Sequence, residues 1–282
     1  MEARFEQFIR ERKYLTNVTA ATTEWYRRCL KWLPSENPTD EDLKALVLCM
    51  RQKGLKKTGV NTVLRCINAY LHWNSGSERK CGAGCSHPRI RQLKEPRLVL
   101  PTFKEAEVKR LIAWKPRKPE RRLKLLVLFL LDTGARITEA LSLRLADIDL
   151  DNLLVTLDGK GRKQRVVPIS FELRKAIFRA ATERELKPGN LLFGTRTGTI
   201  WSRRNALRNL KDICKQLGFT PPPRTLHATR HTFAVNYLRR GGSVFHLQKV
   251  LGHSTLEMTR RYANLVTSDL QAVHERLSLL SK

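Results

Sequence analysis

Apolar residues recur at helical spacing through residues 1–76. In the stretch "TEWYRRCLKWL" they share one helix face and lie at Trp25, Tyr26, Cys29, Leu30 and Leu33. A second stretch, "PTDEDLKALVLCMRQKG", has Thr39 at an N-cap position, acids in its first turn and Gly54 as a stop. The N-terminus and "GVNTVLRCINAYLHW" follow the same helical period. The pattern predicts a compact domain of short helices.

Residues 77–100 break every periodicity and are rich in Gly, Ser, Pro and charged residues. This composition is typical of a linker between domains. Cys81, Cys85 and His87 offer three ligands for a zinc site, but a fourth ligand is not evident and the spacing is not that of a standard ribbon or finger. The favoured interpretation is a flexible basic linker with two exposed thiols, so we expect no metal.

A second domain is predicted over residues 101–265. Thr102 and Glu105 form a capping-box pattern, and the apolar stretch "LKLLVLFLLDTG" predicts a helix that stops at Gly134. "LLVTLDGKGRKQRVVPIS" alternates apolar and polar residues around a Gly-Lys-Gly turn, as a β-hairpin does. Further helices are predicted at 171–186, 202–217, 227–240, 244–251 and 255–263. The predicted fold class is mainly α with one small antiparallel β-sheet.

The final segment, 266–282, has a narrow apolar stripe. Its apolar residues are spaced by alternating fours and threes and lie at Val266, Leu270, Val273, Leu277 and Leu280. This spacing predicts an amphipathic helix. Two uses of that helix stay open, packing on its own domain and docking on a neighbouring protomer.

The net charge is unusual for a soluble globular protein. Lys and Arg number 54 against 26 Asp and Glu, which gives +28. Such an excess costs self-repulsion and usually serves a polyanion such as DNA or RNA. A membrane surface is the competing partner, but no apolar run reaches the length of a span and the N-terminus lacks a signal-peptide core. We expect a cytoplasmic protein, associated with the nucleoid when bound to DNA, with free thiols and no membrane partner.

Breaking a phosphodiester without metal requires a nucleophile, cations for the non-bridging oxygens and an acid for the departing oxygen. The sequence contains candidates of each kind near predicted turns and helix ends, namely Arg136, Lys160, His227, Arg230, His253 and Tyr262. Arg136 opens a helix, whose N-terminus attracts anions, and His227 and Arg230 share one helix face. Each residue alone has an ordinary explanation, since Tyr262 on a helix usually just packs. The combination favours phosphate chemistry.

Four stretches resemble the successive boxes of the tyrosine recombinase, or phage integrase, family. They are "TGARITEALSLRLADID", "GKGRKQRVVPIS", "HATRHTFAVNYLRRGG" and "VLGHSTLEMTRRYANL". They stand in the family order from Pro101 onward, and each position that the family uses for catalysis carries its usual residue. The resemblance implies a mostly helical catalytic domain behind an N-terminal helical core-binding domain with a SAM-like fold.

The resemblance also implies a nucleophile and its anion-binding partners. Tyr262 attacks the scissile phosphate to give a 3′-phosphotyrosyl link, while Arg136 and Arg230 hold the non-bridging oxygens. Neither ATP nor any cofactor is implied. The implied partners are double-stranded DNA, three further copies of the chain in a synaptic homo-tetramer, and optional accessory proteins. The free protein is expected to be a monomer or weak oligomer.

The remaining site residues are assigned in the same way. Lys160 protonates the leaving 5′-oxygen, His227 assists proton transfer around the nucleophile, and His253 hydrogen-bonds the phosphate. Glu139 matches the buried acid of the family and is expected to orient the helix that begins at Arg136.

Other basic residues fit a DNA-docking surface. In the hairpin, side chains expected to reach phosphates beside the cleavage point are Arg162, Lys163 and Arg165. A helix laid against the duplex is expected to use Arg203, Arg204, Arg208, Lys211 and Lys215. Most such contacts position a protein on DNA without reading bases.

Three other functions explain part of the sequence. A type IB topoisomerase shares the chemistry but relaxes supercoils, and a catalytically silent DNA-binding regulator shares the fold. The silent regulator is disfavoured because Arg136, Lys160, Arg230 and Tyr262 are all intact. A general RNA-binding protein explains the charge but not the spaced residues.

Overall fold

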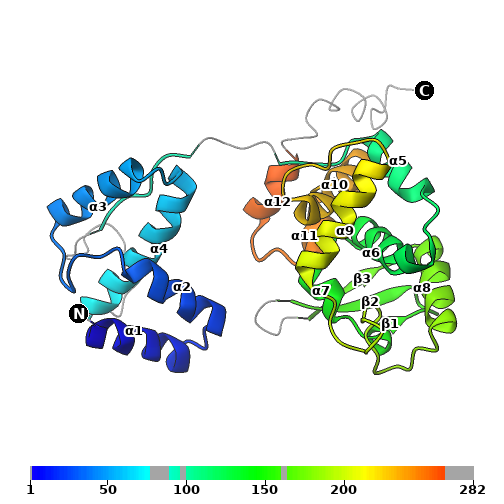
Figure 1. The fold of residues 1–282 in the computed structure, drawn as a ribbon, viewed down its shortest axis with the longest axis horizontal. Coiled ribbons are helices and arrows are strands. Elements are labelled where there is room, and N and C mark those ends of the chain that lie inside the picture. The colour runs from blue at the N-terminus through cyan, green and yellow to red at the C-terminus, as the bar shows by residue number, and fades with distance from the viewer. Residues whose placement is uncertain (1, 77–88, 96–99, 160–163, 264–282) are drawn as a thin grey trace. The chain divides into compact units, whose positions relative to one another are not determined.

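The computed structural model describes residues 2–76, 89–95, 100–159 and 164–263. The chain divides into two compact units, Met1–Leu98 and Val99–Lys282 (Figure 1). Each unit has its own apolar core. Several predictions concern residues outside the described ranges, namely Cys81, Cys85, His87, Lys160, Arg162, Lys163 and the tail helix over 266–282.

The first unit is built from helices alone in its described part. They are α1 (Glu2–Leu15), α2 (Ala20–Leu30), α3 (Asp40–Gln52) and α4 (Lys57–Asn74). Aromatic side chains join them, since the fully buried rings of Phe8 on α1 and Tyr70 on α4 meet edge to face with centroids 5.6 Å apart. Thr39 caps α3 as predicted, because its hydroxyl accepts from the Asp42 backbone N–H at 3.2 Å.

Part of the segment expected to be a free linker is held by α4. Asn61 donates to the Leu93 carbonyl at 2.9 Å and accepts from the Leu93 N–H at 2.7 Å. Asn68 makes the same pair of contacts with Ile90. Two amides spaced seven residues apart lie on one helix face, so an extended strand of chain is fixed along α4 without forming a sheet. Residues 89–95 are therefore an ordered part of the first unit.

The second unit is mostly helical. Its helices are α5 (Glu105–Ala113), α6 (Arg121–Thr133), α7 (Ile137–Ser142), α8 (Phe171–Glu183), α9 (Arg203–Gln216), α10 (Thr225–Arg239), α11 (Val244–Leu251) and α12 (Leu256–Ala263). Helix α6 is buried almost all round and packs against α8 and α10 (Figure 1). The predicted capping box at Thr102 is wrong: α5 begins at Glu105, and Glu107 accepts from the Lys104 N–H at 2.9 Å.

A three-stranded antiparallel sheet lies at one side of this unit. Its strands β1 (Ile148–Asp149), β2 (Leu154–Asp158) and β3 (Gln164–Pro168) pair in chain order. The predicted hairpin is confirmed as β2 and β3, with Val155 opposite Val167 on the buried face. Strand β1 was not predicted, because two residues are too few to show an alternating pattern.

None of the described helices has the length and apolar character that a membrane span requires.

Candidate active site

The turn between α6 and α7 places Arg136 at a helix start. Gly134 ends α6 with φ +62°, and a Cβ there would lie 2.4 Å from the Phe233 ring, so the close packing of this turn requires glycine. Arg136 is the N-cap residue of α7. Its backbone N–H and guanidinium both donate to Glu139, at 2.7 and 2.8 Å. The Arg136 side chain is 34% exposed and can meet a ligand.

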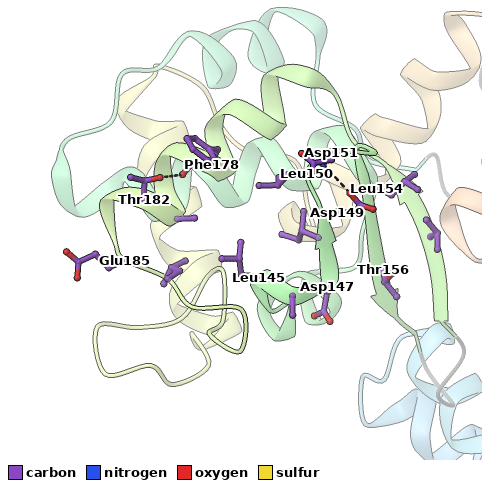
Figure 2. Close-up of a pocket in the computed structure, with 15 residues that line it drawn as sticks. Leu145, Asp147, Asp149, Leu150, Asp151, Leu154, Thr156, Phe178, Thr182 and Glu185 are labelled. Carbon is purple, nitrogen blue, oxygen red and sulfur yellow. Dashed lines mark hydrogen bonds between the residues drawn. The ribbon is translucent and has the colours of Figure 1, made fainter.

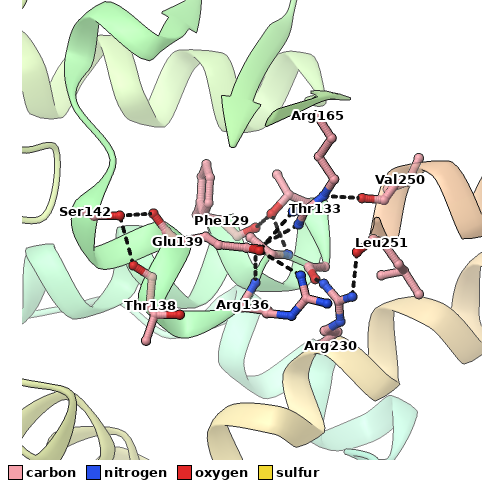
Figure 3. A network of polar contacts seen from close by, with 12 residues as sticks. Phe129, Thr133, Arg136, Thr138, Glu139, Ser142, Arg165, Arg230, Val250 and Leu251 are labelled. Carbon is pink, nitrogen blue, oxygen red and sulfur yellow. Dashed lines mark hydrogen bonds and ion pairs between the residues drawn. The ribbon is translucent and has the colours of Figure 1, made fainter. Parts of the chain in front are cut away.

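Glu139 is a buried carboxylate held between two arginines (Figure 3). Arg165 on β3 donates to both of its oxygens, at 2.9 and 2.8 Å, and Arg136 donates from the other side. Burial by itself would raise the pKa of Glu139. The hydrogen bonds from Arg165 and Arg136 outweigh burial and lower that pKa to about 2. Glu139 is therefore ionised at neutral pH and fixes both guanidinium groups.

Arg165 does not lie where a DNA-phosphate contact was expected. Its side chain is only 10% exposed, and its Nε also donates to the Val250 carbonyl at 2.8 Å. Each guanidinium nitrogen of Arg165 thus donates to a group of the protein. Such pairing is needed because a buried cation costs free energy unless it is paired. Arg165 ties the hairpin strand β3 to α7 and to the end of α11.

Arg230 is the most buried cation of the group. It lies on α10 and donates to two helix-end carbonyls, Gly134 at 2.8 Å and Leu251 at 2.6 Å (Figure 3). Burial is the main cause that lowers its pKa to about 10, and the positive charges of Arg136 and Arg165 add to that effect. The guanidinium stays charged at neutral pH. It joins the C-terminal ends of α6 and α11 behind Arg136.

His253 and Tyr262 stack next to Arg230. Their rings are 7° from parallel with centroids 6.2 Å apart. The His253 Nδ1 lies 2.9 Å from the Thr259 hydroxyl, and burial and Arg230 lower the His253 pKa to about 4. Tyr262 is 4% exposed and packs into the apolar cluster of α10 and α11, which includes Leu251.

His231 is a site residue that the sequence did not reveal. Its Nδ1 lies 2.9 Å from the Tyr262 hydroxyl. Burial first, and then the positive neighbours, lower its pKa to about 4, so the imidazole is neutral at pH 7. Its position directly after Arg230 was the available signal, although a one-residue step on a helix turns the side chain by about 100°.

His227 lies in the first turn of α10, at the rim of this group. Its side chain reaches the surface, yet partial burial and the charges of Arg203 and Arg230 lower its pKa. It borders a pocket of about 710 Å³, whose basic lining residues are Arg203, Lys211, Lys215 and Arg224. Arg204 and Arg208 are exposed on the same helix, α9. The buried face of α9 is apolar, so its predicted basic residues point to solvent.

A second pocket, of about 830 Å³, lies away from these residues at the sheet and α8 (Figure 2). Its lining includes four acids, namely Asp147, Asp149, Asp151 and Glu185. Carboxylates repel a phosphate. This pocket is therefore not the place where a nucleic-acid backbone binds.

The second unit matches the model of a known protein family. The sequence model of the Phage integrase family matches residues 101–268, more than half of the chain. The chain belongs to the phage integrase family.

Two curated proteins that are similar to this chain are tyrosine recombinases. Tyrosine recombinase XerA of Pyrococcus furiosus is 30% identical over 253 residues, which are 86% of this chain and 82% of that protein. Tyrosine recombinase XerC of Xanthomonas campestris pv. campestris is 28% identical over an alignment of 284 positions. The alignment covers 96% of this chain and 86% of that protein.

Two solved structures share the fold. The Tn1549 transposon integrase in complex with transposon right end DNA has a TM-score of 0.76 and 22% identity, and the match covers 98% of this chain and 99% of that one. The XerH site-specific recombinase, in a post-cleavage complex with palindromic difH substrate, has a TM-score of 0.75 and 18% identity, with 100% and 85% covered.

Five of the six residues that the phage integrase resemblance singled out lie in the described part of the chain. Mutual charge effects link Arg136, His227, Arg230, His253 and Tyr262 into one group. They come from α10, α12, the start of α7 and the turn after α11. Lys160 falls outside the described residues, between β2 and β3. No group of three or more His, Cys, Asp or Glu side chains able to hold a metal occurs in the described ranges.

The charge balance of this phage integrase site favours an anion. Three guanidinium groups, those of Arg136, Arg165 and Arg230, surround the single carboxylate of Glu139. Burial nevertheless raises the pKa of Tyr262, and the opposing effects of Arg230, Arg136 and Arg261 do not outweigh it. In the DNA-free protein the phenol is therefore protonated. The positive surroundings suit a bound phosphate more than a resting phenolate.

Proposed function

We propose that this chain is a site-specific DNA recombinase that cuts and rejoins strands through a 3′-phosphotyrosyl intermediate, without ATP or a metal ion. The observation that carries the proposal is the position of the Tyr262 hydroxyl beside His231 and the stacked His253, within the positive field of Arg136 and Arg230. Relatives over most of the chain are named tyrosine recombinases, and two structures of the same fold hold DNA.

The proposed step is an exchange of one ester for another. The Tyr262 oxygen attacks the scissile phosphorus, and the bond from phosphorus to the 5′-oxygen breaks. Lys160 supplies the proton that this oxygen needs to leave as a hydroxyl. The new ester has a free energy close to that of the old one, so a 5′-hydroxyl from a second duplex can reverse the reaction. Strand exchange then needs no external energy source.

The guanidinium groups of Arg136 and Arg230 are proposed to stabilise the transition state. Arg136 and Arg230 are held in advance by Glu139 and by two helix-end carbonyls, so little reorganisation is needed when charge builds on the phosphate oxygens. His253 contributes a further hydrogen bond to the phosphate from its Nε2. His227 stands at the rim of the group, one turn before Arg230 on α10.

DNA engagement has to move Tyr262. In the DNA-free protein its side chain is buried against α10 and α11. Helix α12, which carries it, is described over Leu256–Ala263. A modest shift of α12 brings the hydroxyl out to a phosphate at the rim. In this proposal the hydroxyl stays within hydrogen-bond reach of His231 while the phosphate approaches.

Double-stranded DNA is the proposed substrate, and the basic face of α9 is proposed to lie against its backbone. The tail over 266–282 is proposed to dock on a neighbouring protomer and so to link four copies around two duplexes. If a chain truncated at residue 265 still assembles tetramers on its site, the tail has no such role. The proposed location is the cytoplasm, on the nucleoid.

Two DNA substrates separate the three functions. A nicked duplex separates silent DNA binding from strand cleavage, and a pair of duplexes separates recombination from topoisomerase-like relaxation. A nicked duplex loses its short 5′-hydroxyl fragment after cleavage, so the covalent protein–DNA complex accumulates. Wild-type protein should form this complex, Tyr262→Phe should form none, and Tyr237→Phe should behave as wild type. A silent binding protein gives no complex at all. Two intact duplexes that each carry the cleavage site should give products with exchanged arms, whereas an enzyme that only relaxes supercoils returns the parental duplexes.

A further inference from the structure

The phenol of Tyr262 has an imidazole partner that the family resemblance did not assign. The His231 Nδ1 lies 2.9 Å from the Tyr262 hydroxyl, and the two ring centroids are 5.6 Å apart. Helices α10 and α12 pack against each other, which brings these residues together although 31 positions separate them. A contact at this distance is a full hydrogen bond.

His227, the histidine expected to assist proton transfer, occupies a different place. It lies one turn earlier on α10, and the charged groups that act on it are Arg203, Arg230, Arg224 and Arg136. Among the hydrogen bonds of the described residues, the Tyr262 hydroxyl has its imidazole partner in His231 and not in His227. Of the two histidines, His231 is therefore the one with a hydrogen bond to the Tyr262 hydroxyl in the described residues.

The protonation state of His231 suits an acceptor. Burial first, and then His227, Arg230 and Arg224, lower its pKa to about 4. His253 faces it from the turn before α12. A neutral imidazole has one nitrogen with a free lone pair. In the tautomer with its hydrogen on Nε2, Nδ1 can accept the Tyr262 O–H, and the proposal uses this tautomer.

We propose that His231 accepts the phenolic proton of Tyr262 during strand cleavage. This role rests on the proposed recombinase chemistry and makes it more specific. The O–H bond of Tyr262 breaks as an N–H bond forms at Nδ1, and the phenolic oxygen bonds to phosphorus. The bond from phosphorus to the 5′-oxygen breaks, and Lys160 protonates that oxygen. When a 5′-hydroxyl attacks the phosphotyrosine, the proton returns from His231 to Tyr262.

Substrate binding makes His231 a stronger base. Without DNA, the nearby cations disfavour a second positive charge. A phosphodiester held by Arg136 and Arg230 adds a negative charge to the same pocket and offsets this repulsion. The affinity of Nδ1 for a proton therefore rises when the scissile phosphate is in place. In the free protein the phenol keeps its proton, which protects the nucleophile from premature reaction.

Glutamine substitutions separate proton transfer from positioning. In His231→Gln the amide oxygen can still accept a hydrogen bond from Tyr262 but cannot take its proton. His227→Gln is the matched control on the same helix. The readout is the single-turnover rate of covalent complex formation on the nicked duplex, followed from roughly pH 6 to pH 10, where a phenol ionises unaided. DNA affinity and thermal stability are measured for each variant.

The proposal predicts a distinctive pH profile. His231→Gln should be slower than wild type by about 10²-fold near pH 7, and the deficit should shrink as the pH rises. His227→Gln should show a loss that does not depend on pH. A wild-type rate for His231→Gln, a deficit equal at every pH, or the pH-dependent recovery in His227→Gln would each overturn the role of His231. Absence of a covalent complex with wild-type protein would overturn the recombinase proposal itself.

A spectroscopic measurement does not depend on a variant that folds. In wild-type protein labelled with ¹⁵N-histidine, the Nδ1 shift of His231 should be that of an unprotonated nitrogen accepting a hydrogen bond at neutral pH. It should move toward the free-acceptor value in Tyr262→Phe. A protonated Nδ1 in the wild-type protein would contradict the proposal.

Discussion

The Arg165 guanidinium grips both carboxylate oxygens of Glu139, at 2.9 and 2.8 Å, from a strand that lies 26 residues further along the chain. Since Glu139 also receives two donors from Arg136, a single buried carboxylate fixes the hairpin strand and the anion-binding arginine together. Strand β3 leads directly from the segment that carries Lys160. The network thus connects strand β3 to the proposed phosphate clamp.

Neutralising Glu139 is expected to destabilise the second unit. In Glu139→Gln, two guanidinium groups lose their counter-charge, and the loss of one partner from a buried ion pair costs about 3–5 kcal/mol of unfolding free energy. Urea denaturation measures this cost. Glu172→Gln is the control, because Glu172 pairs with Lys175 on an exposed face and its loss should change stability little. Equal stability of the two variants would mean that the network is not a structural element.

Acid should destabilise the protein in two stages. The folded-state pKa values of His231 and His253 are lowered to about 4, below the ordinary value of 6.5. Unfolded histidines thus take up protons first, and stability is lost as the pH falls from about 6.5 toward 4. The pKa of Glu139 is lowered to about 2 from 4.5, so its contribution is lost between those values.

Denaturation midpoints measured across this pH range test the two stages. The double variant with His231→Gln and His253→Gln should weaken the upper stage, to which the lowered pKa of His227 also contributes, and keep the lower one. His246→Gln, on the exposed side of α11, should keep both. A double variant whose stability still falls between pH 6.5 and pH 4 as in the wild type would show that other groups govern this stage.

Lys160 is expected to act only on the leaving group. In Lys160→Ala, cleavage of an ordinary nicked duplex should be slowed by about 10²–10⁴-fold, the usual contribution of a positioned acid. A substrate with sulfur in place of the bridging 5′-oxygen should restore the rate, because a thiolate leaves without protonation. The comparison is made at saturating DNA in single-turnover reactions. If both substrates are slowed alike, Lys160 does not serve as the acid.

The exposed arginines of α9 are expected to contribute affinity through phosphates. The double variant Arg204→Ala and Arg208→Ala should bind duplex DNA more weakly for every sequence. The slope of log affinity against log salt should fall by about 1 for each phosphate that the variant no longer neutralises. Lys175→Ala on α8 is the control. It removes one positive charge from another helix and should leave the slope unchanged. An unaltered slope in the α9 variant would place the DNA elsewhere.

Local signals allowed most of the fold to be predicted. The Thr39 cap, the apolar run of α6 and the hairpin alternation each depend on residues a few positions apart, and each appears in the structure. The start of α5 was misplaced because Glu107, and not Glu105, accepts the hydrogen bond from the backbone N–H that precedes the helix. The binding of residues 89–95 along α4 escaped prediction because it depends on two amide side chains and leaves no periodic pattern.

The site was predictable as residue types but not as contacts. The family resemblance selected the residues, whereas the partners of Arg165 and His231 follow from how β3, α10 and α12 pack. Basic composition suggested that every arginine of the hairpin faces DNA. Burial decided otherwise for Arg165, because a carboxylate was within reach.

The central claim is that the hydroxyl of Tyr262 becomes joined to the cut DNA. Digestion of the trapped complex to peptides, followed by mass spectrometry of the peptide that keeps a nucleotide, identifies the attachment site directly. We predict a single 3′-phosphotyrosyl link at Tyr262, present in wild-type protein and in Tyr237→Phe and absent from Tyr262→Phe. Attachment through another residue, or through the 5′ end of the DNA, would contradict the account.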